Sequence, residues 1–129
     1  MSMTIEQAGE HADAWYAAWA SHDKATILAL YADDVHFVSP SVRFLVGEPS
    51  GTLHGRGALA AFLDAALPRF HDLTFRPLAL MVGMGDSIAL HYAGVGGVLV
   101  AEVVTLRDGV IATSNTHYAT DFPSVAAAG

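Results

Sequence analysis

One carboxyl side chain stands in an otherwise apolar stretch of this sequence. Glu102 lies within Val98-Leu99-Val100-Ala101-Glu102-Val103-Val104. If it shares a strand face with Val100 and Val104, its carboxyl group lies in a dry cleft, where desolvation raises the pKa and makes it a general acid or hydrogen-bond donor. If it faces the other way, it lies on an outer surface or in a dimer interface. The first arrangement is favoured, so Glu102 is the strongest catalytic candidate.

Ser39 is the second candidate, because it ends an apolar row directly before Pro40. Side chains alternate along a strand, so in a strand from Val35 to Ser39 the side chains of Val35, Phe37 and Ser39 share one face. A polar side chain at the end of such a row can contact a ligand. A serine hydroxyl cannot act as a base unless another group deprotonates it. We therefore expect Ser39 to orient a ligand.

The elements that must position these residues begin with helices, which apolar spacings of three and four predict. The first runs from Thr4 to about Ser21, where Thr4 and Gln7 fit a capping box. Two more are expected at 24–32 and 57–69. The segment 41–52 is expected to be a loop, acting as a plain crossover, a lid or an interface arm.

Strands are expected to follow these helices, separated by glycine-rich turns such as Asp108-Gly109. A strand is expected at 35–39 and a short one at 53–55, before the third helix. Four more are expected at 73–82, 87–95, 98–107 and 110–121. The last residues, 122–129, are small and are expected to fray. Helices followed by mostly antiparallel strands indicate an α+β fold, with a curved sheet that encloses a pocket against the helices.

Composition narrows the classes of partner. The 129 residues are 53% hydrophobic and 15% charged, which indicates a folded domain with few surface charges, and we expect a homodimer to cover part of that surface. The net charge is −7 and no basic cluster occurs, so neither nucleic acid nor a membrane surface is an expected partner. There is no cysteine, no signal peptide and no run of about 18 apolar residues, and we expect a cytoplasmic protein.

Two segments, Asp23 to Pro40 and Leu53 to Phe62 (Leu-His-Gly-Arg-Gly-Ala-Leu-Ala-Ala-Phe), resemble the nuclear transport factor 2-like superfamily. The similarity is to the branch that holds ketosteroid isomerase and the SnoaL-like polyketide cyclases. Asp108-Gly109-Val110-Ile111 and His117-Tyr118 add weaker support. The resemblance implies a cystatin-like α+β roll, in which a cone-shaped, curved antiparallel sheet packs against three helices from the N-terminal half. It covers nearly the whole chain, and we expect residues 1–129 to form a single domain with an ordered core at about 4–121.

The resemblance also indicates how the ketosteroid isomerase site maps onto this chain. The general base of those enzymes, an Asp before the proline that ends the first strand, corresponds to Ser39. Their oxyanion tyrosine falls near Trp15, with Tyr16 one residue away, and their protonated Asp falls near Glu102. The base is therefore absent, and steroid isomerisation by the family mechanism is not expected. Glu102, Ser39 and Tyr16 remain the catalytic candidates.

The pocket wall is expected to be largely aromatic, with strand parity set by the family register. That register turns Ser114, Thr116 and Tyr118 inward, and an outward His91 places Tyr92 inside. The expected ligand-contacting residues are Trp15, Trp19, Tyr31, Phe37, Phe62, Tyr92, Val100, Thr116 and Tyr118.

The histidines are scattered without metal-ligand spacing, so no metal and no cofactor are expected. Two functions remain open. One is an enzyme with metal-free acid–base chemistry, of the isomerase, cyclase or lyase type, acting on a small hydrophobic cyclic or carbonyl compound. The other is a non-catalytic ligand-binding or dimeric interaction domain.

Overall fold

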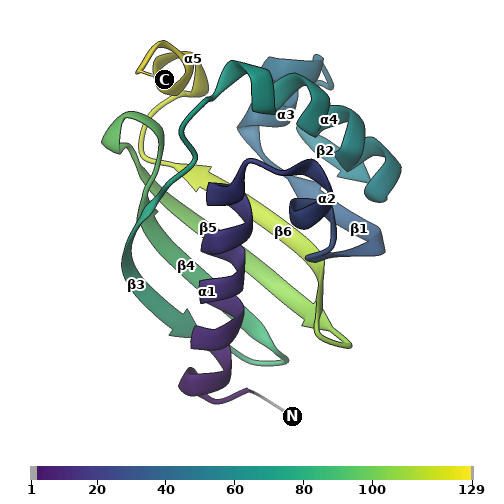
Figure 1. Cartoon of the computed structure of the whole chain (residues 1–129), viewed down its shortest axis with the longest axis vertical. Helices are drawn as coiled ribbons and strands as arrows, with labels where there is room; N and C mark the ends of the chain where they lie inside the picture. Colours follow the sequence, from purple (N-terminus) through teal and green to yellow (C-terminus); the bar gives the residue numbers. More distant parts are fainter. Residues whose placement is uncertain (1–2, 129) are drawn as a thin grey trace.

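A curved, open six-stranded sheet forms the frame of the molecule, with strand order β2-β1-β6-β5-β4-β3 (Figure 1). The computed structural model describes residues 3–128. The strands are β1 (Tyr31–Val38), β2 (Thr52–His54), β3 (Arg76–Val82), β4 (Ser87–Ala93), β5 (Leu99–Arg107) and β6 (Val110–Tyr118). The helices are α1 (Ile5–Ser21), α2 (Lys24–Leu28), α3 (Pro40–Val46), α4 (Arg56–Arg69) and α5 (Phe122–Ala128), with a 3-10 turn η1 (Val95–Gly97). The predicted α+β class with a curved sheet is confirmed.

The strands pair antiparallel except for β1 and β6, which run parallel. The β5–β6 hairpin closes through Asp108 and Gly109, whose φ angles of 54° and 81° are those that a tight hairpin turn requires. Because β6 pairs with β1, the last strand of the chain lies beside the first. This pairing joins the β3–β6 meander to the N-terminal half.

Helix α1 lies across one face of the sheet, which we call the inner face (Figure 1). The predicted capping box is present, since Thr4 accepts from the backbone N–H of Gln7 and Gln7 accepts from that of Thr4. The buried stripe of α1 packs into a core that it shares with the inward-facing side chains of the strands. The stripe consists of Ala8, Ala12, Trp15, Ala18 and Trp19.

Across β3 to β6, the opposite, outer face carries two rows of aliphatic, asparagine and histidine side chains. The register aligns Met81, Ala89, Val103 and Asn115 in one row across β3 to β6. A second row holds Ala79, His91, Ala101 and His117. These side chains are exposed or partly exposed, and none is a carboxylate.

The prediction of a loop over 41–52 is wrong for its first half, because Pro40–Val46 forms helix α3. Ser39 caps this helix by accepting from the N–H of Ser41, Pro40 occupies its first turn, and Gly47 ends it at a φ of 74°. Serine at the cap, proline at the start and glycine after the end is a complete helix signature. The signature was present in the sequence, but the helix is only two turns long.

The predicted frayed tail is also wrong within the described residues, because Phe122–Ala128 forms helix α5. Phe122 and Val125 are both buried, and Asp121 caps the helix by accepting from the N–H of Ser124 at 3.0 Å. Arg69 donates to the carbonyl of Ala126 at 2.6 Å. Gly96 permits the close approach of η1, since a Cβ at that position would overlap the Cβ of Ala128. The helices therefore number more than the three predicted.

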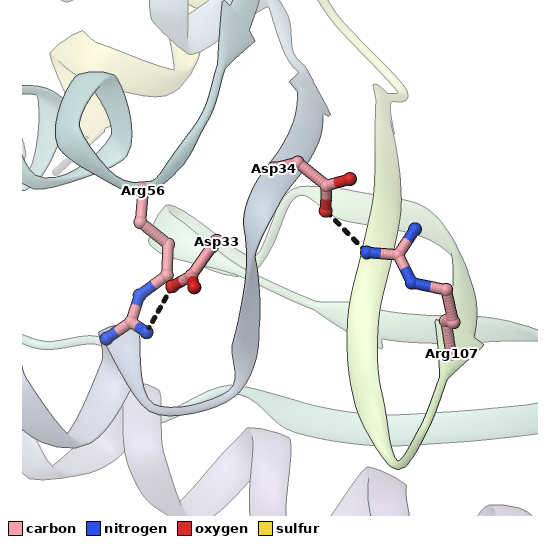
Figure 2. Close-up of polar contacts among 4 residues, drawn as sticks. All are labelled: Asp33, Asp34, Arg56 and Arg107. Carbon is pink, nitrogen blue, oxygen red and sulfur yellow. Dashed lines mark hydrogen bonds and ion pairs between the residues drawn. The ribbon is translucent and has the colours of Figure 1, made fainter.

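Two exposed ion pairs join the first half of β1 to α4 and to β5 (Figure 2). Asp33 and Asp34 both lie in β1, which begins at Tyr31 instead of 35, and the helix before them ends at Leu28 instead of 32. Asp33 pairs with Arg56 at 3.1 Å, and Asp34 pairs with Arg107. Figure 2 shows the two carboxyl groups pointing to opposite sides of the strand. The hydrogen bond from Arg107, with its charge, lowers the pKa of Asp34.

Among residues 3–128, none of the helices has the length and apolar character needed to cross a bilayer. The cytoplasmic location stays a prediction.

Candidate ligand-binding site

A cavity of about 80 Å³ lies between the inner face of the sheet and the helices. All the helices and strands except β2, β3 and α2 contribute residues to its wall. The residues of its wall are Trp15, Trp19, Phe37, Ser39, Ser41, Leu45, Phe62, Ala66, Phe70, Leu73, Phe75, Tyr92, Gly94, Val95, Val100, Glu102, Thr116, Tyr118, Phe122 and Val125. The wall is therefore mostly aromatic and aliphatic, with few polar groups, as in typical sites for small organic ligands.

Glu102 is the one carboxyl group in this wall, and it is 3% exposed. Thr116 donates to both of its carboxyl oxygens at 2.9 Å, and Tyr92 donates to Oε1 at 3.3 Å. Ser114 donates to Oε2. Burial raises the pKa of Glu102, and the hydrogen bonds from Ser114, Thr116 and Tyr92 offset part of that rise. All three hydroxyl groups are neutral, and the charge of His117 is the last of the effects that lower this pKa against the desolvation that raises it.

The sheet register explains why these hydroxyl groups surround Glu102. Thr116 lies directly opposite Glu102 on β6. Ser114 is opposite Val104, and Tyr92 is opposite Val100, so each is a diagonal neighbour of Glu102 on the same inner face. The predicted inward parity of Ser114, Thr116 and Tyr92 agrees with this arrangement.

An aromatic cluster forms the wall beside Glu102. The ring of Tyr92 stacks on Phe75 with centroids 4.8 Å apart, and Trp15 lies 5.3 Å from Tyr92. Burial, followed by the charge of Glu102, raises the pKa of Tyr92 well above its ordinary value. Tyr92 therefore keeps its proton and acts toward Glu102 as a donor.

Ser39 lies in the cavity wall, but its hydroxyl group is engaged in the cap of α3. Its Oγ accepts from the N–H of Ser41 at 3.2 Å and lies 2.6 Å from the hydroxyl of Ser41. Tyr118 is the nearby ionisable group, and burial together with Glu102 raises its pKa to about 12. A tyrosine that holds its proton so firmly cannot deprotonate serine, so the arrangement gives Ser39 no activating base. A role in orienting a ligand stays a prediction.

Tyr16 and Tyr31 do not line the cavity, although both were predicted to belong to the site. Successive residues of a helix point about 100° apart, so Trp15 occupies the cavity wall and Tyr16 turns aside. The ring of Tyr16 meets Trp15 and Tyr92 edge-on, at centroid distances of 5.2 and 5.8 Å. Burial and the charge of Glu102 raise the pKa of Tyr16 to about 12. Tyr31 is 2% exposed and lies in the core.

Ten of the twelve predicted site residues thus share one cavity: Glu102, Ser39, Trp15, Trp19, Phe37, Phe62, Tyr92, Val100, Thr116 and Tyr118. The wall also contains residues that the sequence analysis did not assign to it. Leu45 comes from α3, and Phe122 and Val125 come from α5. The apolar spacing of Phe122 and Val125 was the available signal, but the small residues around them favoured a frayed end. Within 3–128, the acidic residues and histidines form no cluster of three that could bind a metal.

Comparison with known proteins places this geometry in context. A family model described as a SnoaL-like domain matches residues 12–114. The chain is similar to a SnoaL-like protein of unknown function from Burkholderia thailandensis E264, at 36% identity over 93% of this chain and 100% of that chain, with a TM-score of 0.86. A comparison by sequence with curated proteins finds no match.

Two further solved structures share the fold at lower identity. One is TerC, co-crystallised with polyporic acid, at 20% identity and a TM-score of 0.70, covering 92% of this chain and 96% of that chain. The other is a putative ketosteroid isomerase from Kribbella flavida DSM 17836, at 16% identity and a TM-score of 0.63, covering 89% and 79%.

Proposed function

The chain belongs to the SnoaL-like domain family, and we propose that it binds a small, largely apolar cyclic molecule against Glu102. The observation that carries this proposal is the burial of one carboxyl group among neutral hydroxyl groups in an otherwise apolar cavity. A carboxyl group in such surroundings keeps its proton to a higher pH than a free one. Protonated Glu102 can donate a hydrogen bond to a carbonyl or hydroxyl oxygen of the ligand.

The enzymatic form of this proposal is acid–base chemistry of the isomerase or cyclase type. Glu102 would protonate or polarise a carbonyl oxygen as charge develops on it. Moving a proton between carbon atoms also requires a base, and the described residues around the cavity include no second carboxyl group and no histidine. The chemistry would therefore have to use Glu102 for both proton transfers, or a basic group of the substrate.

A non-catalytic binding domain is the second candidate, and the state of Ser39 favours it. By the family resemblance this residue corresponds to the position of the isomerase base, and its hydroxyl group is engaged in capping α3. Because Ser39 caps a helix and no base occupies that position, Glu102 would hydrogen-bond a ligand that is bound and released without chemical change. Turnover of a bound carbonyl compound separates the two candidates.

The pKa of Glu102 tests the proposal directly. We expect carbon-detected NMR of labelled protein to give a pKa above 4.5, with Glu102→Gln used to assign the carboxyl signal. A ligand panel of cyclic ketones, with polyporic acid included, would be screened by tryptophan fluorescence, since both tryptophans line the cavity. A pKa at or below 4.5, together with no binding from the panel, would overturn the proposal.

We further propose that two copies associate through the outer face. The chain carries a net charge of −7, which opposes self-association. The rows at Met81 to Asn115 and Ala79 to His117 contain no carboxylate, although the chain has 13 acidic residues. A second copy is the occupant that such a face suits, because pairing these rows brings no carboxylates of the two negatively charged chains together.

A further inference from the structure

Glu102 lies at the floor of the cavity, as the register of the sheet shows. Each inward residue of β5 pairs with one residue on β4 and one on β6, which gives three rows across the inner face. The first row lies wholly in the cavity wall, two members of the second row do, and no member of the third row does. In order, the rows are Tyr92, Val100 and Tyr118; Leu90, Glu102 and Thr116; and Ile88, Val104 and Ser114. The cavity therefore ends at the row that contains Glu102.

Ser114 contacts Glu102 from beyond this floor. Its side chain is 1% exposed, and its hydroxyl group donates to Oε2 of Glu102. Tyr92 belongs to the row above the floor and donates to Oε1 at 3.3 Å. Thr116, in the same row as Glu102, donates to both oxygens at 2.9 Å. The two carboxyl oxygens thus have different surroundings, with Oε2 directed beneath the floor and Oε1 toward the cavity.

The protons of these hydroxyl groups fill the contacts around the carboxyl group. Each hydroxyl group has one proton to donate, and within residues 3–128 Glu102 is the acceptor of all three. A proton carried by Glu102 must therefore point away from these three contacts, each of which already contains a proton. Oε1 is the oxygen that can carry it, because its contact with Tyr92 is long and it faces the cavity. A ligand oxygen is then the available acceptor.

We propose that Ser114 is a positioning residue, which holds Oε2 of Glu102 and thereby directs the protonated Oε1 toward an acceptor oxygen of the ligand. Without such a contact the carboxyl group can turn about its last side-chain bond, for which the torsion is broad. Ser114 lies outside the cavity wall and acts on the ligand only through Glu102. This inference rests on the proposed binding function and specifies how its acidic group is oriented.

The same contact also affects the titration of the carboxyl group. Burial raises the pKa of Glu102, and the hydrogen bond from Ser114 is the largest of the effects that oppose this rise. Loss of the Ser114 hydroxyl group should therefore raise the pKa of Glu102 further. The orientation of the carboxyl group and its pKa are two separate properties, and both can be measured.

Ser114→Ala removes the hydroxyl group and leaves the residues of the cavity wall unchanged. Thr113→Ala is the matched control, because it removes a hydroxyl group from the adjacent residue, whose exposed side chain contacts Thr105. Carbon-detected NMR of labelled protein gives the pKa of Glu102, with Glu102→Gln to assign the signal. Tryptophan fluorescence between pH 4 and pH 8 gives the affinities for cyclopentanone and cyclopentane, which differ by one carbonyl oxygen.

The wild-type protein should bind cyclopentanone about tenfold more tightly than cyclopentane at pH 4. This preference should disappear as the pH rises through the pKa of Glu102, since an ionised carboxylate cannot donate. Ser114→Ala should raise that pKa and move the loss of preference to higher pH. At pH 4, where Glu102 is protonated in both proteins, Ser114→Ala should reduce the preference by about threefold, because the carboxyl group is no longer held. Thr113→Ala should match the wild-type protein in both measurements.

The outcomes separate this inference from the function on which it rests. If Ser114→Ala leaves the pKa and the ketone preference unchanged, the positioning role is overturned and the binding function stands. A raised pKa with an unchanged preference at pH 4 would also overturn it, because Ser114 would then affect only the charge of Glu102. If the wild-type protein binds neither compound up to its solubility, or binds both equally at pH 4, the proposed contact with Glu102 fails and the positioning role fails with it.

Discussion

The two faces of the sheet are built from the same strands and differ in almost every property. On β5, Val100, Glu102 and Val104 point inward and are 2%, 3% and 3% exposed. Their neighbours Ala101 and Val103 point outward and are exposed. The inner face keeps the carboxyl group of Glu102 within a set of hydrogen bonds, whereas the two outer rows across β3 to β6 are exposed or partly exposed and contain no carboxylate. A single step along the strand therefore changes the expected effect of a substitution from loss of folding to loss of association.

The largest effect should follow from placing a charge on the inner face. Val104→Asp would bury an unpaired carboxylate in the core and should lower the free energy of unfolding by about 3 kcal/mol or more. Urea unfolding followed by circular dichroism measures this change. Val103→Asp is the matched control, since the adjacent side chain faces outward. Equal destabilisation by the two variants at a concentration where the protein is monomeric would contradict the assigned parity.

Removing the aromatic ring that closes the cavity should have the next largest effect. Phe122→Ala empties a buried site that contacts Phe70 and Tyr118, and it should cost about 3 kcal/mol of unfolding free energy. Phe44→Ala removes a ring that packs on the same Phe122 but is 46% exposed, so it should cost much less. Thermal denaturation of both variants provides the measurement. A neutral Phe122→Ala would mean that α5 does not cover the cavity in solution.

The buried carboxyl group of the inner face should make the stability of the fold depend on pH. The pKa of Glu102 is raised in the folded protein, so the native state holds a proton that the unfolded chain releases above about pH 4.5. Its contribution to stability is complete below that pH and is lost as the pH rises through the folded pKa. The slope should be at most about 1.4 kcal/mol per pH unit.

Glu102→Gln tests this dependence, because it retains the shape of the side chain and cannot ionise. Unfolding free energies measured in urea at intervals between pH 4 and pH 8 should show a flatter profile for the variant in this window. A wild-type profile that rises with pH across the same range, and that Glu102→Gln does not alter, would mean that the carboxyl group is ionised and well solvated.

The smallest change in unfolding free energy should follow from a substitution on the outer face. Val103→Asp should leave the monomer within about 0.5 kcal/mol of its original stability, since the side chain is solvent-exposed. At the proposed interface it would add one negative charge from each copy and should prevent association. Light scattering coupled to size-exclusion chromatography should show dimers of the wild-type protein and monomers of Val103→Asp. A wild-type monomer at every accessible concentration would remove the proposed interface.

Several features of the site were predictable because they depend on local patterns. The inward parity of Phe37 and Val100 follows from alternating side chains along a strand, and the placement of Trp15 and Trp19 follows from the spacing of a helical stripe. The family was predicted from two short segments and is confirmed by the family model and by the relative at 36% identity. Helix α3 was missed although its cap signature is present in the sequence, because it is only two turns long. Helix α5 was missed because its residues are mostly small and contacts with the rest of the chain stabilise it.

Tyr16 shows a different limit of sequence reasoning. The family resemblance placed a functional tyrosine near Trp15, and Tyr16 is the tyrosine adjacent to that position. The rotation of the helix by one residue moves its side chain out of the cavity wall and against the edge of Tyr92. Proximity in sequence was therefore a poor guide on a helix, where neighbours point in different directions.

By itself the sequence determined the order of the main elements, the apolar surroundings of Glu102 and the absence of a carboxylate at Ser39, since each of these is a property of residue types and local periodicity. Only the tertiary structure decided which hydroxyl groups contact Glu102, because Tyr92, Ser114 and Thr116 reach it through the register of three strands. It also decided that α5 closes the cavity, since Arg69 donates to Ala126 across 57 positions of the chain. Contacts of that range depend on the folded geometry and leave no local pattern to read.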